Sequence, residues 1–215
     1  VDPESGLPDY TRLPVETLER LELVYVCSPS NPTGGVMSAD GYRELLALAD
    51  RYDFVLAADE CYSEIYPDED RPPAGLLEVA AAEGRTDFRR CLAFHSLSKR
   101  SNLPGLRSGF VAGDGELIAQ FLRLRTYQGN ATPLPLQAGA VAAWGDETHV
   151  RANREAYRER FAAVLEILSP VLEVSAPDGG FYLWPRVPGG GERFARELYA
   201  REAITVLPGA YLGRE

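Results

Sequence analysis

Short apolar runs and longer amphipathic segments alternate along the first half of the chain. Four apolar runs of strand length each give way to polar residues: 23–27, 54–58, 91–95 and 108–112. Between the first two runs, Ser38 is placed to cap a helix that extends to Tyr52, with apolar residues at helical spacing. Apolar strands that alternate with helices are typical of a parallel α/β sheet covered by helices on both faces.

Helical spacing dominates after Asp114. The long charged segment 146–168 carries Tyr157, Phe161 and Leu165 at helical spacing and could connect two domains. The other expected elements are helices over 15–20, 76–82, 116–127, 133–144 and 192–201, and strands over 172–175, 181–185 and 204–207. We therefore predict an α/β unit over residues 1–145 and a smaller α+β unit over residues 146–215.

Composition and charge exclude several classes of protein. The chain has 215 residues, of which 45% are hydrophobic and 25% are charged, as in globular domains. A formal net charge of -10 argues against nucleic acid as the main partner. No apolar run is long enough to span a membrane. The three cysteines are far apart and form no C-x-x-C pair, so we expect reduced thiols and a cytoplasmic protein.

Two histidines far apart in the sequence do not predict a metal site. We expect His95 to pack at the rim of any site that follows its strand, and His149 to lie on the surface at a helix start. We assign no role to Glu60 or Glu64.

Lys99 is the only lysine, whereas every other basic residue counted with it is arginine. Arginine stays protonated, but lysine can lose its proton and form an imine. A single unimportant lysine in an arginine-rich chain is the simpler explanation, but the neighbours favour a function. Ser96 and Ser98 precede the lysine and Arg107 follows it, which suggests a bound phosphate. An imine-forming lysine beside a phosphate site indicates pyridoxal phosphate.

Other polar residues follow other predicted strands. Asn31 lies in a proline- and glycine-rich loop after the first strand, and Asp59 ends the second, with Tyr62 three residues on. Each could be an ordinary loop or strand-end residue. Ligands of parallel α/β sheets, however, bind beyond the carboxyl ends of the strands. A carboxylate there could pair with the protonated ring nitrogen of pyridoxal phosphate, and Tyr62 could donate to the ring oxygen.

Three segments, SPSNPTG, DECYSEIY and SLSKRSNLPGLRSGF, resemble the central motifs of the fold-type I pyridoxal-phosphate aminotransferases of classes I and II. The resemblance covers essentially the whole chain, including GGFYLW at 179–184 and VLPGAYLG at 206–213. Within that family the chain looks most like succinyldiaminopimelate aminotransferases of lysine biosynthesis. The resemblance implies a mostly parallel sheet with flanking helices from the large cofactor-binding domain, followed by most of the small C-terminal α+β domain.

The resemblance also implies a role for each candidate residue. Lys99 would bond to the cofactor as an imine and then move the proton at the substrate α-carbon. Asp59 would pair with the pyridine nitrogen, while Asn31 and Tyr62 would hydrogen-bond the phenolic oxygen. The phosphate would be held by Ser96, Ser98 and Arg107. The partners implied are small amino and keto acids, and a second copy of the full-length chain in a homodimer.

Compared with the family, the chain looks like a fragment. We find no counterpart before Val24 of the family's glycine-containing phosphate loop or of the aromatic residue that stacks on the cofactor ring. Arg214 does not match the arginine that clamps the substrate carboxylate, which is expected beyond Glu215. We therefore expect the 215-residue chain alone to bind the cofactor weakly and to show no useful turnover.

Three functions remain open on sequence alone. The first is transamination between glutamate or 2-oxoglutarate and a keto acid, N-succinyl-diaminopimelate chemistry being the expected case. The second is another enzyme of the same scaffold, either a different aminotransferase or a β-lyase. The third is a non-catalytic, aminotransferase-like ligand-binding domain, as in some regulators that carry an N-terminal DNA-binding domain.

Overall fold

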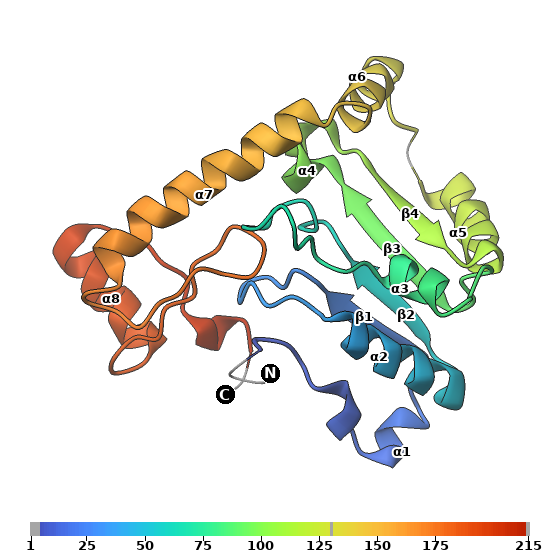
Figure 1. The fold of residues 1–215 in the computed structure, drawn as a ribbon, viewed down its shortest axis with the longest axis horizontal. Coiled ribbons are helices and arrows are strands. Elements are labelled where there is room, and N and C mark those ends of the chain that lie inside the picture. The colour runs from blue at the N-terminus through green and yellow to red at the C-terminus, as the bar shows by residue number, and fades with distance from the viewer. Residues whose placement is uncertain (1–4, 130, 214–215) are drawn as a thin grey trace.

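A computed structural model describes residues 5–129 and 131–213 of the chain. Within that part, one sheet has four strands in the order β1-β2-β3-β4: β1 (Leu23–Cys27), β2 (Val55–Asp59), β3 (Cys91–Ser96) and β4 (Gly109–Gly113). The first three strands are parallel and β4 is antiparallel to β3. All four match the apolar runs of the sequence to within one residue, and the sheet is mostly parallel as predicted. In Figure 1 the carboxyl ends of the parallel strands point toward the long helix α7.

β4 runs antiparallel to β3 because the connection between them does not cross a face of the sheet. A parallel strand would need such a crossover, usually built around a full helix. The connection here contains only α4 (Leu97–Arg100) and the 3₁₀ turn η2 (Pro104–Leu106). The chain therefore turns back at the same edge of the sheet, where Ser96 pairs with Gly109.

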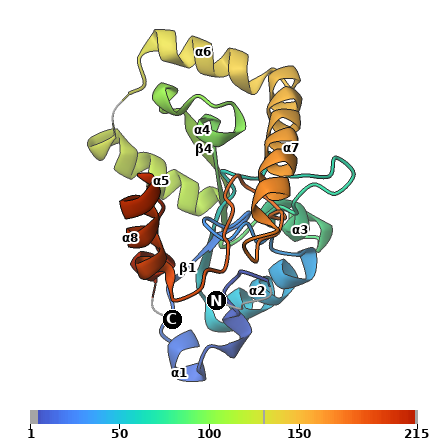
Figure 2. The same ribbon diagram turned by 90° about the vertical axis from the view of Figure 1, so that its left-hand side faces the viewer.

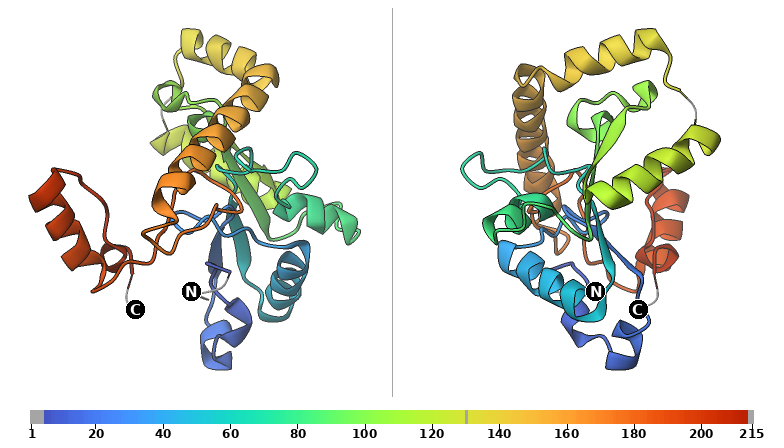
Figure 3. Two further views of the ribbon diagram at one scale, coloured as in Figure 1. Left: turned by 60° about the vertical axis from the view of Figure 1, so that its left-hand side comes forward. Right: turned by 90° about the vertical axis from the view of Figure 1, so that its right-hand side faces the viewer.

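One face of the sheet is covered by helices. α2 (Ala39–Tyr52) is capped by Ser38, whose hydroxyl accepts the Gly41 N–H at 3.0 Å. Its apolar face packs with α3 (Leu76–Ala82) on alternate residues of the strands, and Figure 3 shows both helices on one side of the sheet. The buried cluster includes Val24, Val26, Tyr42, Leu45, Leu46, Ala49, Leu56, Ala58, Leu76, Val79 and Cys91.

The remaining helices lie at the edges of the sheet or beyond the ends of its strands. Figure 2 shows α5 on the side opposite α3, and Figure 1 shows α7 running across the carboxyl ends of the strands. The bounds of these helices are α1 (Val15–Leu18), α5 (Gly115–Gln128), α6 (Leu134–Trp144), α7 (Thr148–Leu168) and α8 (Gly191–Glu202), with 3₁₀ turns η1 (Tyr10–Arg12) and η3 (Gly209–Tyr211). Each predicted helix is present, with ends that differ by up to two residues. No helix among the described residues is long and apolar enough to cross a membrane.

The three strands predicted after residue 170 are wrong. Segments 172–175 and 181–185 form no strand, and the one bridge nearby is an isolated antiparallel bridge between Glu173 and Arg186, just after the second segment. Residues 204–207 form no strand, and Ile204, Val206 and Leu207 are exposed. A β-strand exists only as part of a hydrogen-bonded ladder, and these segments have no such ladder within the described part of the chain. The proposed division at residue 145 stays a prediction.

Candidate active site

The carboxyl edge of the sheet brings the predicted residues toward one place. Cys27, Asp59 and Phe94 lie side by side at the ends of β1, β2 and β3. Asn31 follows β1, and Lys99 lies in the first turn after β3. Asp59 and Lys99 are partly accessible and Asn31 is exposed, so a small molecule can reach all three.

Two serine hydroxyls meet at the start of the lysine helix. Ser96 caps α4, and its Oγ accepts the backbone N–H of Ser98 at 3.1 Å. The same Oγ lies 2.9 Å from Ser98 Oγ and 3.3 Å from the carbonyl oxygen of Ser108. The two hydroxyls predicted to hold a phosphate are therefore next to each other, at the end of a strand.

The Lys99 ammonium group lies against aromatic rings. Its Nζ is 4.9 Å from the centre of the Phe181 ring and 5.6 Å from the centre of the Tyr62 ring. The negative face of an aromatic ring attracts a cation at this distance. The two rings also contact each other edge to face, with centres 5.3 Å apart. Residues more than a hundred positions apart therefore fix the direction of the only lysine.

Tyr62 links Asn31 to the C-terminal region. Its hydroxyl is 3.5 Å from Asn31 Nδ2 and 3.3 Å from the Tyr182 hydroxyl. Burial, with a smaller effect from the hydrogen bond to Tyr182, raises the pKa of the Tyr62 hydroxyl. The group therefore remains a hydrogen-bond donor at neutral pH, beside the amide of Asn31.

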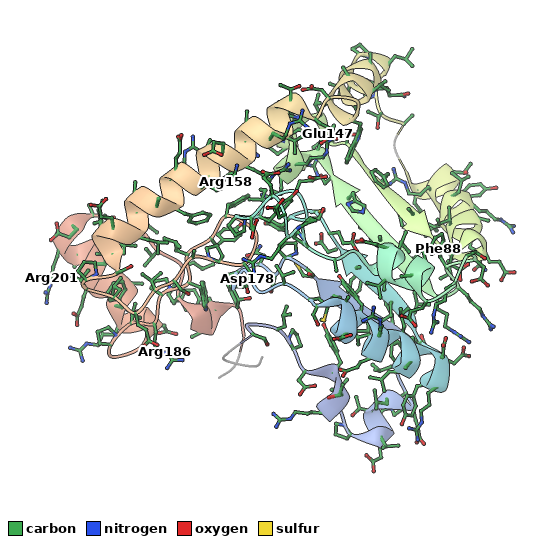
Figure 4. All side chains as sticks on the ribbon, in the orientation of Figure 1. Phe88, Glu147, Arg158, Asp178, Arg186 and Arg201 are labelled. Atoms are coloured by element: carbon green, nitrogen blue, oxygen red, sulfur yellow. The ribbon has the colours of Figure 1, made fainter. Side chains whose placement is uncertain are left out.

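Glycines allow the C-terminal region to reach the site. Gly179 N–H donates to the Gly34 carbonyl at 3.0 Å, and Gly180 N–H donates to the Ile65 carbonyl at 2.8 Å. Gly34 has a positive φ of 77°, and a Cβ on it would lie 2.4 Å from Pro177 Cβ. A side chain at this position would separate the two backbones. Figure 4 shows side chains filling the space between α7 and the strand ends, with Asp178 near its centre.

Asp59 ends β2 with its carboxylate partly accessible. Its Oδ1 accepts the Cys61 N–H at 3.1 Å. Burial, followed by the hydrogen bond to Asp59 and its negative charge, raises the pKa of the Cys61 thiol to about 12. The thiol therefore stays protonated at neutral pH and is not a nucleophile. The negative charge of the Asp59 carboxylate, which acts on Cys61, is also the charge that could pair with a cationic ring nitrogen.

Arg107 is the least constrained of the predicted phosphate ligands. It is exposed, has a positive φ of 50°, and donates from Nη1 to the Pro104 carbonyl at 2.9 Å. Its neighbour Ser108 contacts Ser96, so the guanidinium is attached close to the two hydroxyls. A contact between Arg107 and a phosphate stays a prediction, and Arg214 lies outside the described residues.

Two cavities flank these residues. One of about 600 Å³ extends from Tyr182 along Thr33 and Gly34 to Arg186. The other, of about 280 Å³, is lined by Cys61 and Ser96 and lies beside the start of the lysine helix. Neither lining includes Lys99 or Asp59.

The donor set fits pyridoxal phosphate. It combines one amine, one carboxylate, an amide beside a tyrosine hydroxyl, and a pair of hydroxyls at a helix start, all at one edge of the sheet. Each group has the charge or hydrogen-bonding character that one part of the cofactor requires.

Several contacts of the site are not evident from the sequence. The sequence pattern assigns no role to Phe181 and Tyr182, although an aromatic pair after two glycines is a signal for a packed contact. Glu60 is buried and lies 3.3 Å from His95, in an interaction across two strands that the sequence alone does not reveal. His149 is half-buried and lies 2.8 Å from Ser101 Oγ, so its expected surface position is only partly correct.

Comparisons with known proteins identify the family of this chain. The family model for aminotransferase class I and II matches residues 5–214. The crystal structure of an aminotransferase from Neisseria meningitidis superposes with a TM-score of 0.91 at 51% identity, covering 98% of this chain and 53% of that one. A 4-dedimethylamino-4-oxo-anhydrotetracycline transaminase from Streptomyces rimosus is 41% identical over 202 residues, which are 91% of this chain and 53% of that protein.

A third similar protein is also known from its solved structure. A probable N-succinyldiaminopimelate aminotransferase from Thermus thermophilus has a TM-score of 0.81 at 28% identity, covering 92% of this chain and 53% of that one. The chain spans about half the length of the curated relatives it matches. The family model covers nearly all of the sequence, and aminotransferases of this family use pyridoxal phosphate. The chain belongs to the class I and II aminotransferases.

Proposed function

We propose that the protein carrying this chain is a pyridoxal-phosphate-dependent aminotransferase that exchanges an amino group between glutamate or 2-oxoglutarate and a second amino or keto acid. The observation that carries this proposal is the arrangement of Lys99. Its amine lies against the rings of Tyr62 and Phe181, and its charge acts on Cys61, two residues after Asp59. No other lysine is present in the chain to take the same role.

Each residue has a defined task in this reaction. When bound, pyridoxal phosphate supplies an aromatic ring that withdraws electrons from the substrate α-carbon. Lys99 Nζ holds the cofactor covalently and later moves the proton at the α-carbon. Asp59 keeps the ring nitrogen protonated by pairing with its positive charge.

The remaining ligands fix the cofactor in place. Asn31 Nδ2 and the Tyr62 hydroxyl both donate toward the ring oxygen. Ser96 and Ser98 donate to the phosphate, and Arg107 adds a positive charge there.

The second substrate is proposed to be an N-succinyl-diaminopimelate-type acid, so that the enzyme would act in lysine biosynthesis. This rests on the HSLSKRSNLPGLRSGFVAGD segment and on the similarity to the Thermus protein. The higher identity to a tetracycline transaminase favours a different aminotransferase as the second candidate. Initial rates with a panel of keto acids and glutamate, using protein from the complete reading frame, would separate the two. Pyruvate and ammonia from cystathionine would instead indicate a β-lyase, and an upstream helix-turn-helix with no turnover would indicate a regulator.

Borohydride trapping tests the lysine directly. Reduction of protein mixed with pyridoxal phosphate should fix the cofactor as a stable secondary amine on Lys99, located by peptide mass mapping. Lys99→Arg keeps the positive charge but cannot form an imine, and should show neither the label nor turnover. Lys99→Ala should behave in the same way. Turnover close to that of the unmodified protein in either variant would overturn the proposed mechanism.

We also propose a homodimer in a reducing, cytoplasmic environment. α5 and α6 expose Phe121, Leu122, Leu124, Leu134 and Val141, and such apolar surface is typical of interaction sites. The three cysteines are free thiols. Sedimentation analysis of protein from the complete reading frame should give twice the monomer mass, and a monomer would contradict this part of the proposal.

A further inference from the structure

Side chains at the ends of β2 and β3 alternate between the two faces of the sheet. Asp59 is paired with Phe94, so these two residues share one face. The next residue on each strand, Glu60 and His95, points to the opposite face, on which α3 packs. Asp59 is the proposed ligand of the ring nitrogen, and Ser96 is a proposed ligand of the phosphate. In the sequence, Asp59 directly precedes Glu60 and Ser96 directly follows His95, so the pair lies on the face of the sheet opposite these two ligands.

The carboxylate of Glu60 connects three elements. Only 5% of Glu60 is exposed, and its Oε1 accepts the Leu76 N–H at the start of α3 at 2.7 Å. Its Oε2 lies 3.3 Å from His95 Nε2. The backbone N–H of Glu60 also continues the sheet by donating to the Phe94 carbonyl at 2.9 Å. A buried carboxylate needs such partners, because burial removes the water that would otherwise stabilise it.

The imidazole of His95 is held on its other sides as well. Its ring stacks on Phe110 of β4 with centres 5.0 Å apart, and Phe110 contacts Trp144 of α6 at the same separation. The side chain is 27% exposed, toward the cavity of about 280 Å³. The other charged residues lining this cavity are Glu64, Glu147 and Arg100, and Arg100 is itself paired with Glu147. Among the described residues, the direct charged partner of His95 is Glu60.

We infer that Glu60 and His95 form a positioning pair for the cofactor site. The pair joins the ends of β2 and β3 from behind, so that the Asp59 carboxylate and the Ser96 hydroxyl keep a fixed separation. Neither residue touches the proposed cofactor ligands' functional groups; the pair acts through the backbone of the two strands. This inference rests on the proposed function, because it concerns the binding of pyridoxal phosphate at that edge.

The chemistry of the pair predicts which imidazole nitrogen carries the proton. His95 Nε2 lies 3.3 Å from a carboxylate oxygen, which only accepts hydrogen bonds, so this contact favours a proton on Nε2. In Glu60→Gln the amide Oε1 can still accept the Leu76 N–H. Its NH₂ group would then face His95 Nε2, and two donors would meet. The imidazole would respond by moving its proton to Nδ1, so that Nε2 accepts from the glutamine.

The experiment uses protein from the complete reading frame with four variants: Glu60→Gln, His95→Phe, the double variant that combines these two, and Glu78→Gln. His95→Phe keeps an aromatic ring against Phe110 but removes the imidazole nitrogens. Glu78→Gln is the matched control, because Glu78 accepts the Gly75 N–H at 3.4 Å in the same turn of α3 and lies outside the contact between Glu60 and His95. Imidazole ¹⁵N shifts of the cofactor-free protein report the tautomer, and fluorescence titration reports the dissociation constant for pyridoxal phosphate.

We expect the Nε2-protonated tautomer in the unmodified protein and the Nδ1-protonated tautomer in Glu60→Gln. The dissociation constant should rise about tenfold in Glu60→Gln and in His95→Phe, as for other residues that orient ligand-binding groups. The double variant should be no weaker than either single variant, because one shared interaction is lost. Glu78→Gln should bind like the unmodified protein.

Several outcomes would contradict the inferred positioning role of Glu60 and His95. These are unchanged affinity in Glu60→Gln, an unchanged tautomer, or equal losses in Glu78→Gln. If Glu60→Gln does not fold, the dissociation constant of His95→Phe for pyridoxal phosphate is the test. An unchanged dissociation constant in that variant rejects the inference. Failure of the unmodified protein to bind pyridoxal phosphate would instead reject the proposed function, and the tautomer measurement would still test the contact between the two side chains.

Discussion

The sheet and the C-terminal region differ in how deeply they bury their apolar side chains. On the sheet, alternate residues of the strands are buried under α2 and α3, and Leu56 is fully buried. In the C-terminal region, by contrast, 57% of Leu207 is exposed, as are large parts of Tyr199 and Tyr211. The candidate site lies where the two regions meet, at Tyr62 and Phe181. The sheet therefore provides a stable base for Lys99, and the C-terminal region provides an aromatic wall.

The largest expected effect is a difference in stability between the two regions. Leu56→Ala should lower the free energy of unfolding by about 2–5 kcal/mol, because it leaves a cavity under the helices. Leu207→Ala removes the same atoms from an exposed position and should cost less than about 1 kcal/mol. Urea denaturation followed by circular dichroism measures both. Equal losses would show that Leu207 is buried in the protein in solution, and the contrast between the regions would fail.

The same contrast explains which parts of the fold can be predicted from sequence. Runs such as 23–27 and 91–94 are apolar and form strands, and alternate residues of these strands are buried. α2 has a capping serine and one apolar face, and its bounds match the expected ones. For segments 172–175 and 204–207, the same apolar composition predicts strands. A strand depends on a partner that composition does not specify. Among the described residues, these segments form no ladder beyond the single bridge between Glu173 and Arg186.

The sequence alone predicts those residues of the candidate site whose side-chain chemistry suits one specific contact with the cofactor. A lone lysine near serines and a carboxylate at a strand end both indicate cofactor chemistry from the sequence alone. The contact of Phe181 with Lys99, and that of Glu60 with His95, depend on how distant segments pack. Such contacts leave no local pattern in the sequence. For this reason the sequence indicates the residues proposed to hold the cofactor, whereas the residues that orient them emerge only from the packing.

A second, smaller effect tests the boundary between the regions. Phe181 is half-buried, and its ring contacts those of Tyr62 and Tyr157 as well as the Lys99 amine. Phe181→Ala should cost about 2 kcal/mol of stability, less than a fully buried phenylalanine would. It should also slow the borohydride-trapped reaction of Lys99 with pyridoxal phosphate, because the Lys99 amine loses the aromatic ring that helps to fix its direction. Urea denaturation and a trapping time course measure the two effects.

Tyr199→Ala is the matched control for that variant. Tyr199 is a large aromatic residue of α8 with 63% exposure, in the same C-terminal region. Its removal should leave both the stability and the trapping rate nearly unchanged. A trapping rate in Phe181→Ala equal to that of the control would show that the C-terminal region does not shape the site.

The smallest effect concerns the ion pairs that attach α7 to the loop after β2. Arg154 is buried and donates to both carboxylate oxygens of Glu69 at 2.8 Å, while Arg158 donates to Glu69 at 2.9 Å. Hydrogen bonds from these two arginines lower the pKa of Glu69 from its ordinary value of 4.5 to about 2. A lowered pKa means that the stabilisation is complete above pH 4.5 and is lost as the pH falls toward 2. Because 43% of the Glu69 side chain is exposed, solvent screening limits the effect to about 1 kcal/mol or less.

Glu69→Gln removes the titrating group and keeps the shape of the side chain. The difference in unfolding free energy between this variant and the unmodified protein should therefore shrink as the pH falls from 5 to 2 (about the span between free and paired carboxylates). Glu155→Gln is a suitable control, because Glu155 pairs with Arg158 within α7 and does not join the helix to the loop. Urea titrations at several pH values measure the differences. A constant difference for Glu69→Gln across this range would mean that the contacts of Arg154 and Arg158 with Glu69 add no charge-dependent stability. The attachment of α7 would then rest on its other contacts, among them the ion pair of Arg154 with Glu64 and the ring contact of Tyr157 with Phe181.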